Sequence, residues 1–324
     1  MGPSRSVGLA AEAGHFADRL AALVEERRSR VVLGLDPDPA RLWPGALTGG
    51  GASDAAGRPG APARTDAAAA TADAVARHCR LAIEATGPQC VAVKAQLACF
   101  ERLGAPGWAA LAATRDTARE HGLLLLADGK RGDVPVTAAA YAQALVGDTP
   151  GPFGPVPGLG ADAFTANPLL GRDSLEPLVH AAAEAGAGCF VLVSTSNPGA
   201  ADLQDLDAGG RPLHEHVGEL VDSLGAGHVG ACGLSLVGAV TGATRPERLA
   251  RLRQLMPRAI FLLPGVGAQG GDPAGLGPAY SPHPAAGLVT ASRSIVNAHA
   301  QRGGDPALAA QSAARELRSA TWDI

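Results

Sequence analysis

Asp128, Lys130 and Asp133 fall within six positions of the segment LLLLADGKRGDVPVT (123–137), directly after four leucines. The leucine run predicts a buried strand, and a polar cluster after a strand is often only a solvated turn. The small number of lysines favours a catalytic role for this cluster instead. Of the 27 Lys and Arg residues, only Lys94 and Lys130 are lysines, and both end apolar runs. An ammonium can give up a proton, whereas a guanidinium stays charged. The pattern therefore indicates a lysine that takes part in proton transfer.

The composition narrows the class of protein. A formal charge of −4 and an aromatic content of 3% give no support for nucleic-acid binding. We see no apolar run of 18 or more residues, so we expect no membrane span, and the N-terminus lacks the apolar core of a signal peptide. The sequence therefore predicts a soluble, cytoplasmic protein with a small-molecule substrate.

The cysteines and histidines predict no metal site. The five cysteines are scattered and form no C-x-x-C pair, which is typical of ordinary packing in a reducing compartment. His214 and His216 form H-x-H, but no convincing set of further ligands completes a metal centre.

Short apolar runs alternate with segments of helical spacing. Stretches 107–121, 173–186 and 245–256 have helical spacing, and the expected strands are 30–36, 90–96, 123–130, 161–168, 188–194, 229–237, 259–266 and 286–292. Such alternation favours a parallel sheet. Eight units are also the number that closes an α/β (β/α)8 TIM barrel, and an open doubly wound sheet is the alternative.

Three Gly/Pro-rich stretches interrupt this rhythm, at 45–65, 147–160 and 270–286. None has a periodic apolar face, so we interpret them as loop insertions. We see no domain linker, and residues 1–324 are expected to form one barrel domain.

The polar residues follow the expected strands at one end of the barrel. Asp36 follows VVLGL, Lys94 follows VAV, and Asp128 and Lys130 follow the leucine run. Active sites of such barrels lie at the carboxyl ends of the strands. Residues two apart on a strand share a face, so Asp128 and Lys130 can point into the same mouth, whereas Asp133 lies beyond them and can face elsewhere.

The loops after the last two strands indicate a phosphate group. The seventh strand runs into PGVGAQGG (264–271) and the eighth into ASRSI (291–295). Glycine backbone N–H groups, the Gln269 amide and the Arg293 guanidinium are suited to bind phosphate oxygens. No G-K-[ST] follows the glycines, so this is not a Walker loop. After the fifth strand, STSNPGA (194–200) either reads a polar ring edge or caps the next helix.

These motifs together resemble one family. LGLDPDP, VAVKAQLACFE, DGKRGDVPVT, TANPLLGRDSLEP, VLVSTSNPGA, PGVGAQGG and ASRSI occur in order between about residue 30 and about residue 300. The chain resembles the orotidine 5′-phosphate decarboxylases of the longer bacterial subfamily. The resemblance implies a homodimeric (β/α)8 barrel that converts orotidine 5′-phosphate to UMP and CO2, the last step of de novo pyrimidine synthesis, with no metal or organic cofactor.

The resemblance also assigns roles to residues. Lys130 corresponds to the proton donor to ring carbon C6, Asp128 to the group beside the substrate carboxylate, and Lys94 to the bridge between Asp128 and the ribose. The other assignments are Asp36 for the ribose hydroxyls, Ser196 for the pyrimidine amide, Gln269 and Arg293 for the phosphate, and Asp133 and Thr137 for the partner subunit's site. Two positions depart from the family pattern, since Ala95 replaces an expected proline and Gly129 a commoner alanine.

Other functions stay open on the sequence. A Mg²⁺-dependent sugar-phosphate decarboxylase or aldolase of the same superfamily shares D-x-K-x-x-D. A Schiff-base aldolase would use Lys94 or Lys130, but flanking carboxylates favour the charged amine over the nucleophile. A catalytically inactive phosphonucleotide-binding protein is a third alternative, which the intact set of charged residues disfavours.

Overall fold

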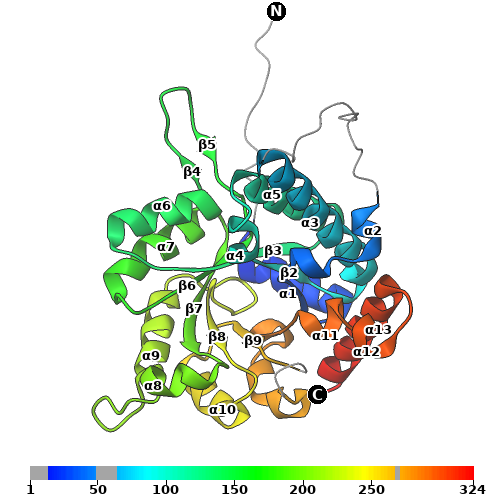
Figure 1. Cartoon of the computed structure of the whole chain (residues 1–324). Coiled ribbons are helices and arrows are strands. Elements are labelled where there is room, and N and C mark those ends of the chain that lie inside the picture. Colours follow the sequence, from blue (N-terminus) through cyan, green and yellow to red (C-terminus); the bar gives the residue numbers. More distant parts are fainter. Residues whose placement is uncertain (1–13, 49–63, 267–270) are drawn as a thin grey trace, which may run out of the picture.

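Eight parallel strands close into a barrel in the computed structural model, which describes residues 14–48, 64–266 and 271–324 (Figure 1). Around the barrel the order is β1, β10, β9, β8, β7, β6, β3, β2, as the eight-unit alternation predicts. The barrel strands are β1 (Val31–Leu35), β2 (Ala92–Gln96), β3 (Leu124–Arg131), β6 (Ala163–Ala166), β7 (Gly188–Ser194), β8 (Val237–Thr241), β9 (Phe261–Pro264) and β10 (Gly287–Ala291).

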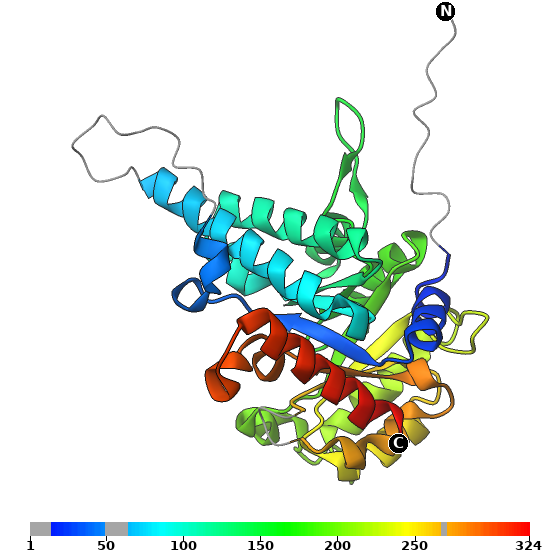
Figure 2. The ribbon, with the colours of Figure 1, turned by 90° about the vertical axis from the view of Figure 1, so that its right-hand side faces the viewer.

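Helices surround the barrel, and α13 packs against α3 beside β1 (Figure 2). The helices predicted at 107–121, 173–186 and 245–256 are confirmed as α5, α7 and α10. The α-helices are α1 (Phe16–Arg27), α2 (Pro44–Leu47), α3 (Arg64–Thr86), α4 (Leu97–Glu101), α5 (Ala105–Glu120), α6 (Pro135–Leu145), α7 (Arg172–Glu184), α8 (Ala201–Gln204), α9 (Leu213–Gly225), α10 (Pro246–Leu255), α11 (Arg293–Val296), α12 (His299–Arg302) and α13 (Pro306–Trp322).

Large apolar side chains fill the core, and glycines let them approach the strands. Phe16 of α1 packs edge-to-face on Phe190 of β7, with ring centroids 5.9 Å apart, and both are fully buried. A Cβ on Gly188, the first residue of β7, would lie 2.6 Å from the Phe16 ring. Helix α1 therefore covers the amino end of β7 and leaves the carboxyl ends of the strands open.

The sixth barrel strand lies later in the chain than the apolar run at 229–237 predicts. Residues 229–236 of the expected strand at 229–237 form a turn instead, in which Gly233 has a φ of 82° and Val229 forms an isolated bridge to Ser235. The strand lies at Val237–Thr241, where Gly238 makes room for the Phe190 ring 2.6 Å from its Cβ position. Glycine inside a strand often marks the close approach of another group, and here it lets the Phe190 ring pack against β8.

The Gly/Pro-rich stretches hold short regular elements rather than loop alone. Within 147–160, β4 (Asp148–Thr149) and β5 (Val156–Pro157) pair as an antiparallel hairpin that projects away from the barrel (Figures 1 and 2). The described part of 270–286 contains 3-10 helices η4 (Pro273–Tyr280) and η5 (Pro284–Ala286). In 45–65, the described ends belong to α2 and α3. Pro44, Pro273 and Pro284 begin α2, η4 and η5, because the fixed φ of proline suits a first helical position.

Candidate active site

Asp128 is the centre of a charged network at the carboxyl end of the barrel. Lys94 Nζ of β2 donates to Asp128 Oδ2 at 2.5 Å, and Lys130 Nζ donates to Oδ1 at 2.6 Å. The register of the parallel strands places Gln96 opposite Asp128, which brings the ends of β2 and β3 together. The structure thus joins three of the predicted site residues around one carboxylate.

Burial and charge oppose each other at Asp128. Burial by itself would raise the pKa of this carboxyl, but the neighbouring Lys94 and Lys130 charges and their hydrogen bonds outweigh it and lower the pKa to about 2. The side chains of Lys94 and Asp128 are only 10% and 8% exposed, whereas that of Lys130 is 42% exposed. The network therefore holds the ionised Asp128 carboxylate buried and leaves the Lys130 ammonium partly exposed.

Two further side chains, Thr165 and Gln96, donate hydrogen bonds to Asp128. Thr165 Oγ1 of β6 donates to Asp128 Oδ1 at 2.9 Å. With its amide nitrogen turned toward Asp128, Gln96 donates to Oδ2 at 2.8 Å and to the Asp128 backbone carbonyl at 3.1 Å. This orientation avoids placing the amide oxygen against two other oxygens. Neither residue was among the predicted site residues, although both lie in quoted motifs, VAVKAQ and TANP.

The network borders two cavities that share Lys94 and Pro264. The larger, of about 490 Å³, is lined by Asp128, Lys130, Ser196 and apolar side chains, which include Leu192, Val240 and Leu262. The smaller, of about 180 Å³, is lined by Asp36, Gly265 and Arg293, among others. Together they form an elongated mouth with a partly apolar chamber at one end and a guanidinium at the other.

The anion-binding features predicted after the last two strands meet at the smaller cavity. Arg293 is exposed at the start of α11, and Gly265 directly follows β9. Asp36 is exposed at the end of β1, and it lines this cavity and an adjoining one of about 210 Å³ that also contains Arg293. Gln269 lies outside the described residues. The described part of the predicted phosphate site is therefore a cavity wall that includes the exposed Arg293 side chain.

The segment after β7 contributes Thr195 and Ser196 to the larger cavity, whereas Ser194 is buried in the strand end. The Thr195 hydroxyl donates to Asn197 Oδ1 at 2.7 Å and accepts from Gln204 Nε2 at 2.8 Å. Gln204 Oε1 also accepts from the Thr195 backbone N–H at 2.8 Å. Because these bonds occupy Thr195, Ser196 is the better placed of the two to meet a ligand. Asn197 makes no side-chain cap on η3 (Pro198–Ala200), so the capping interpretation is wrong.

Asp133 and Thr137 do not line either cavity of their own chain. Asp133 Oδ1 accepts from the neighbouring Val134 N–H at 2.7 Å, and Thr137 is exposed on the first turn of α6. Asn167 N–H donates to the Arg131 carbonyl, which places the segment after β6 beside this turn. Among the described residues, no hydrogen bond or ion pair joins either side chain to the Lys94–Asp128–Lys130 network.

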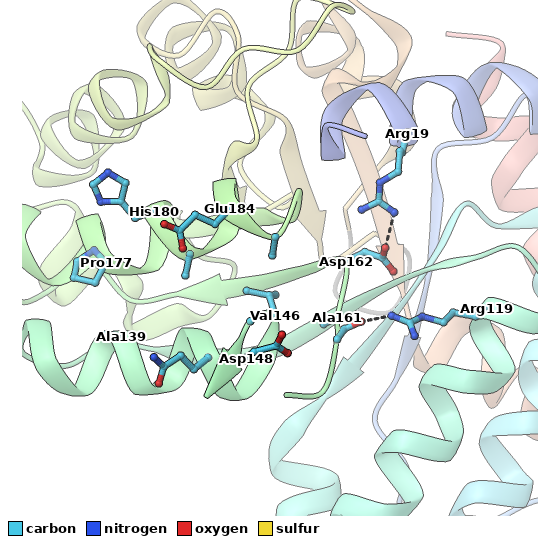
Figure 3. A pocket seen from close by; sticks show the side chains of 15 residues that line it. Arg19, Arg119, Ala139, Val146, Asp148, Ala161, Asp162, Pro177, His180 and Glu184 are labelled. Atoms are coloured by element: carbon cyan, nitrogen blue, oxygen red, sulfur yellow. Dashed lines mark hydrogen bonds and ion pairs between the residues drawn. The ribbon is translucent and has the colours of Figure 1, made fainter. Parts of the chain in front are cut away.

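A larger cavity, of about 670 Å³, lies at the other end of the barrel between α6 and α7 (Figure 3). Arg19 and Asp162 form an ion pair of 2.6 Å in its wall, and Arg119 donates to the Gly160 carbonyl at 2.6 Å. None of the predicted site residues within the described chain lines it. Arg19, Asp162 and Arg119 are thus engaged within the fold, and size alone does not make this cavity the active site.

In residues 14–48, 64–266 and 271–324, no group of three or more His, Cys, Asp and Glu side chains is arranged to hold a metal ion. Over the same ranges, no helix combines the length and apolarity that crossing a membrane requires.

The fold and site define a class: a (β/α)8 barrel with a Lys–Asp–Lys network at the carboxyl ends of its strands. The model of the orotidine 5′-phosphate decarboxylase / HUMPS family matches residues 29–307. This chain belongs to that family.

Relatives and solved structures agree with this assignment. The chain is 40% identical over 284 residues to the orotidine 5′-phosphate decarboxylase of Rhodopirellula baltica, covering 88% of this chain and 89% of that protein. It is 44% identical over 237 residues to the corresponding Deinococcus radiodurans protein, covering 73% and 80%. The structure of Leishmania donovani OMP decarboxylase is similar, with a TM-score of 0.69, 30% identity and coverage of 96% and 99%.

Proposed function

We propose that this chain decarboxylates orotidine 5′-phosphate to UMP and CO2, the last step of de novo UMP synthesis. The observation that carries the proposal is the Asp128 carboxylate bonded to both lysines of the chain. Loss of CO2 from C6 leaves an electron pair in the plane of the ring, which the ring delocalises poorly. With no cofactor as an electron sink, fixed charges must stabilise it as it forms.

Lys130 is suited to this task. Its ammonium is partly exposed at the mouth of the larger cavity and is held by Asp128 at 2.6 Å. In the proposed reaction, the C6–CO2 bond breaks, the electron pair stays on C6, and a proton moves from Lys130 Nζ to C6. Asp128, beside the leaving carboxylate, holds Lys94 and Lys130 in place by opposite charge.

The remaining roles follow the shape of the mouth. The pyrimidine would occupy the larger cavity with Ser196 at its amide, and the phosphate would lie at Arg293 in the smaller one, together with Gln269. Lys94, which both cavities share, and Asp36 then lie beside the ribose. Phosphate binding far from C6 would supply energy that orders the site around the substrate.

A direct assay tests this function. Purified protein treated with EDTA should consume orotidine 5′-phosphate, followed by the loss of its ultraviolet absorbance. A Mg²⁺-dependent sugar-phosphate decarboxylase would be inert in this assay, and borohydride trapping would reveal a Schiff-base aldolase. An EDTA-treated protein without activity on orotidine 5′-phosphate would contradict the proposal.

We also propose that the active form is a homodimer with shared sites. Asp133 and Thr137 line neither cavity of their own chain. The apolar residues Val134 and Val136 of this segment and Leu169 and Leu170 of the segment after β6 are 54%, 85%, 69% and 46% exposed. A second copy that covers this apolar patch would receive Asp133 and Thr137 next to its own Lys130. A symmetric interface would complete both sites together.

Subunit exchange tests the shared site. Lys130→Ala and Asp133→Ala should each be inactive as homodimers. In an equal mixture, half of the dimers are mixed, and each mixed dimer holds one intact site, so about a quarter of wild-type activity per site should return. Activity that stays at the level of the two parents would mean that Asp133 serves its own chain.

We further propose a cytoplasmic location, which the free thiols of Cys79, Cys90, Cys99, Cys189 and Cys232 support, because disulfides are rare in reducing compartments. Fractionation of the producing cells tests it.

A further inference from the structure

The pairing of β3 with β6 is interrupted at the catalytic network. Ala127 pairs with Phe164 and Arg131 pairs with Ala166, so three residues of β3 face the single residue Thr165 of β6. Those three residues are Asp128, Gly129 and Lys130. Bulges of this kind redirect side chains and leave backbone groups without ladder partners.

Lys130 carries the conformational cost of this bulge. Its φ is 48°, one of two positive values among the described non-glycine residues. Left-handed backbone at a long side chain is unfavourable and persists only where neighbouring groups hold it. The Lys130 backbone N–H donates to Thr165 Oγ1 at 2.8 Å, so the side chain of Thr165 takes the place of the missing ladder acceptor.

The Thr165 hydroxyl also binds Asp128, the carboxylate that pairs with Lys130. Thr165 Oγ1 donates its proton to Asp128 Oδ1 at 2.9 Å, and this oxygen also accepts from Lys130 Nζ at 2.6 Å. Thr165 is 1% exposed, which leaves little access for water to replace it. One buried hydroxyl therefore accepts from the lysine's backbone and donates to the carboxylate that holds the lysine's ammonium.

We propose that Thr165 is a positioning residue for Lys130, acting through the β3 bulge and Asp128. The inference rests on the proposed function, in which Lys130 is the proton donor. Without the hydroxyl, the Lys130 N–H loses its acceptor and Asp128 loses a donor on the oxygen that binds the ammonium. The ammonium then has more freedom relative to C6, and misplacement of a reacting group costs rate more than it costs binding.

Two matched pairs of variants isolate the hydroxyl. Thr165→Val keeps the shape of wild type without the hydroxyl, and Thr165→Ala differs from Thr165→Ser only by the hydroxyl. Loss of one hydrogen bond to a charged group predicts a fall in kcat of about 10- to 100-fold for Thr165→Val, with KM within about twofold. Thr165→Ser should stay within about threefold of wild type, and Thr165→Ala should be at least about tenfold slower than Thr165→Ser.

Thr241, at the end of β8, provides the control. It is fully buried like Thr165, but its hydroxyl has no hydrogen-bond partner among the described residues. Thr241→Val should therefore keep wild-type kcat and KM.

The outcomes separate this inference from the proposed function. Wild-type protein without activity on orotidine 5′-phosphate would contradict the function. With active wild type, a Thr165→Val kcat within about threefold of wild type would overturn the positioning role. If Thr165→Val does not fold, the Ser and Ala variants decide, and equal kcat values for these two would overturn it as well. A loss expressed in KM alone would assign Thr165 to binding and would also overturn the proposal.

Discussion

The two ends of the barrel use basic residues in different ways. At the amino end, Arg253 donates to the backbone carbonyls of Met256, Ala259, Ala279 and Ala286 and lies over the Phe261 ring. Arg27 likewise donates to four carbonyls, those of Gly87, Cys90, His121 and Gly122. At the carboxyl end, Lys94 and Lys130 converge on the single carboxylate of Asp128.

We interpret this difference as a division of roles: arginines at the amino end stabilise the fold, and lysines at the carboxyl end take part in the reaction. A guanidinium offers five fixed donors and keeps its proton, so it can tie several chain segments together permanently. An ammonium is compact and can release a proton. In a chain with 25 arginines and two lysines, both lysines lie at the carboxyl end of the barrel, where we propose that a proton moves. Substitutions at the carboxyl end should therefore affect rate, and those at the amino end should affect stability.

The largest effect is expected at Lys130. Lys130→Ala should remove several kcal/mol of transition-state stabilisation, at about 1.4 kcal/mol per tenfold in rate, with little change in thermal unfolding. Lys130→Arg is the matched control, because it keeps the charge but supplies no proton, and it should be equally inactive. Steady-state kcat for either variant above about a tenth of wild type would exclude Lys130 as the proton donor.

Arg253 should show the opposite profile. Arg253→Met removes the donors of four buried carbonyls, and we expect the free energy of unfolding to fall by about 3–5 kcal/mol. The kcat of the folded protein should not change. Urea unfolding and kcat at low temperature measure the two quantities. Arg251→Met, which removes a surface pair with Glu215, should change stability much less. A lower kcat for Arg253→Met in fully folded protein would contradict the division between the two ends.

Arg293 tests the carboxyl end at a distance from the lysines. Arg293→Ala should lower kcat/KM for orotidine 5′-phosphate by about 10- to 100-fold, mainly through KM, because a charge-assisted phosphate contact is lost. Turnover of the phosphate-free nucleoside orotidine should hardly change, since this substrate never makes the contact. Equal proportional losses on both substrates would refute the phosphate assignment.

The smallest effect concerns acid stability. The folded pKa of Asp128, about 2, lies below its ordinary value of 3.8, so the ionised carboxylate stabilises the fold above pH 4. That contribution, on the order of 2 kcal/mol, should disappear as the pH falls from about 4 to 2. Urea midpoints measured across this range should fall less steeply for Asp128→Asn than for wild type. Parallel curves would mean that the lysines do not lower the pKa of this group.

The sequence predicted the barrel and the charged network more fully than the details that position them. Seven expected strands overlap the observed ones because apolar runs and turn residues are local signals. The sixth was misplaced because the apolar run 229–237 leads into the strand and shares only Val237 with it, so the apolar pattern does not separate the two. Asp128 and Lys130 were predicted to share a mouth from their spacing on one strand, and the structure places them together.

The contribution of Thr165 could not be read in the same way. The register shift that brings its hydroxyl to Lys130 depends on pairing between strands about 35 residues apart in the chain. No periodicity within either strand encodes that shift. The roles of Asp133 and Thr137 stay predictions, since they depend on a second copy, and Gln269 lies outside the described residues.

Gly129, inside the β3 bulge, lies against Leu97, so the residues that positions 129 and 97 tolerate depend on each other. A Cβ there would lie 2.7 Å from Leu97 Cδ1 and 3.1 Å from Arg131 Nε, and Leu97 is fully buried. Alanine at 129 therefore requires the Leu97 side chain to shift or to be replaced by a smaller one, because overpacking a full core costs about 1–3 kcal/mol. In evolutionary terms, the two positions are epistatic: the cost of alanine at 129 depends on the size of the side chain at 97.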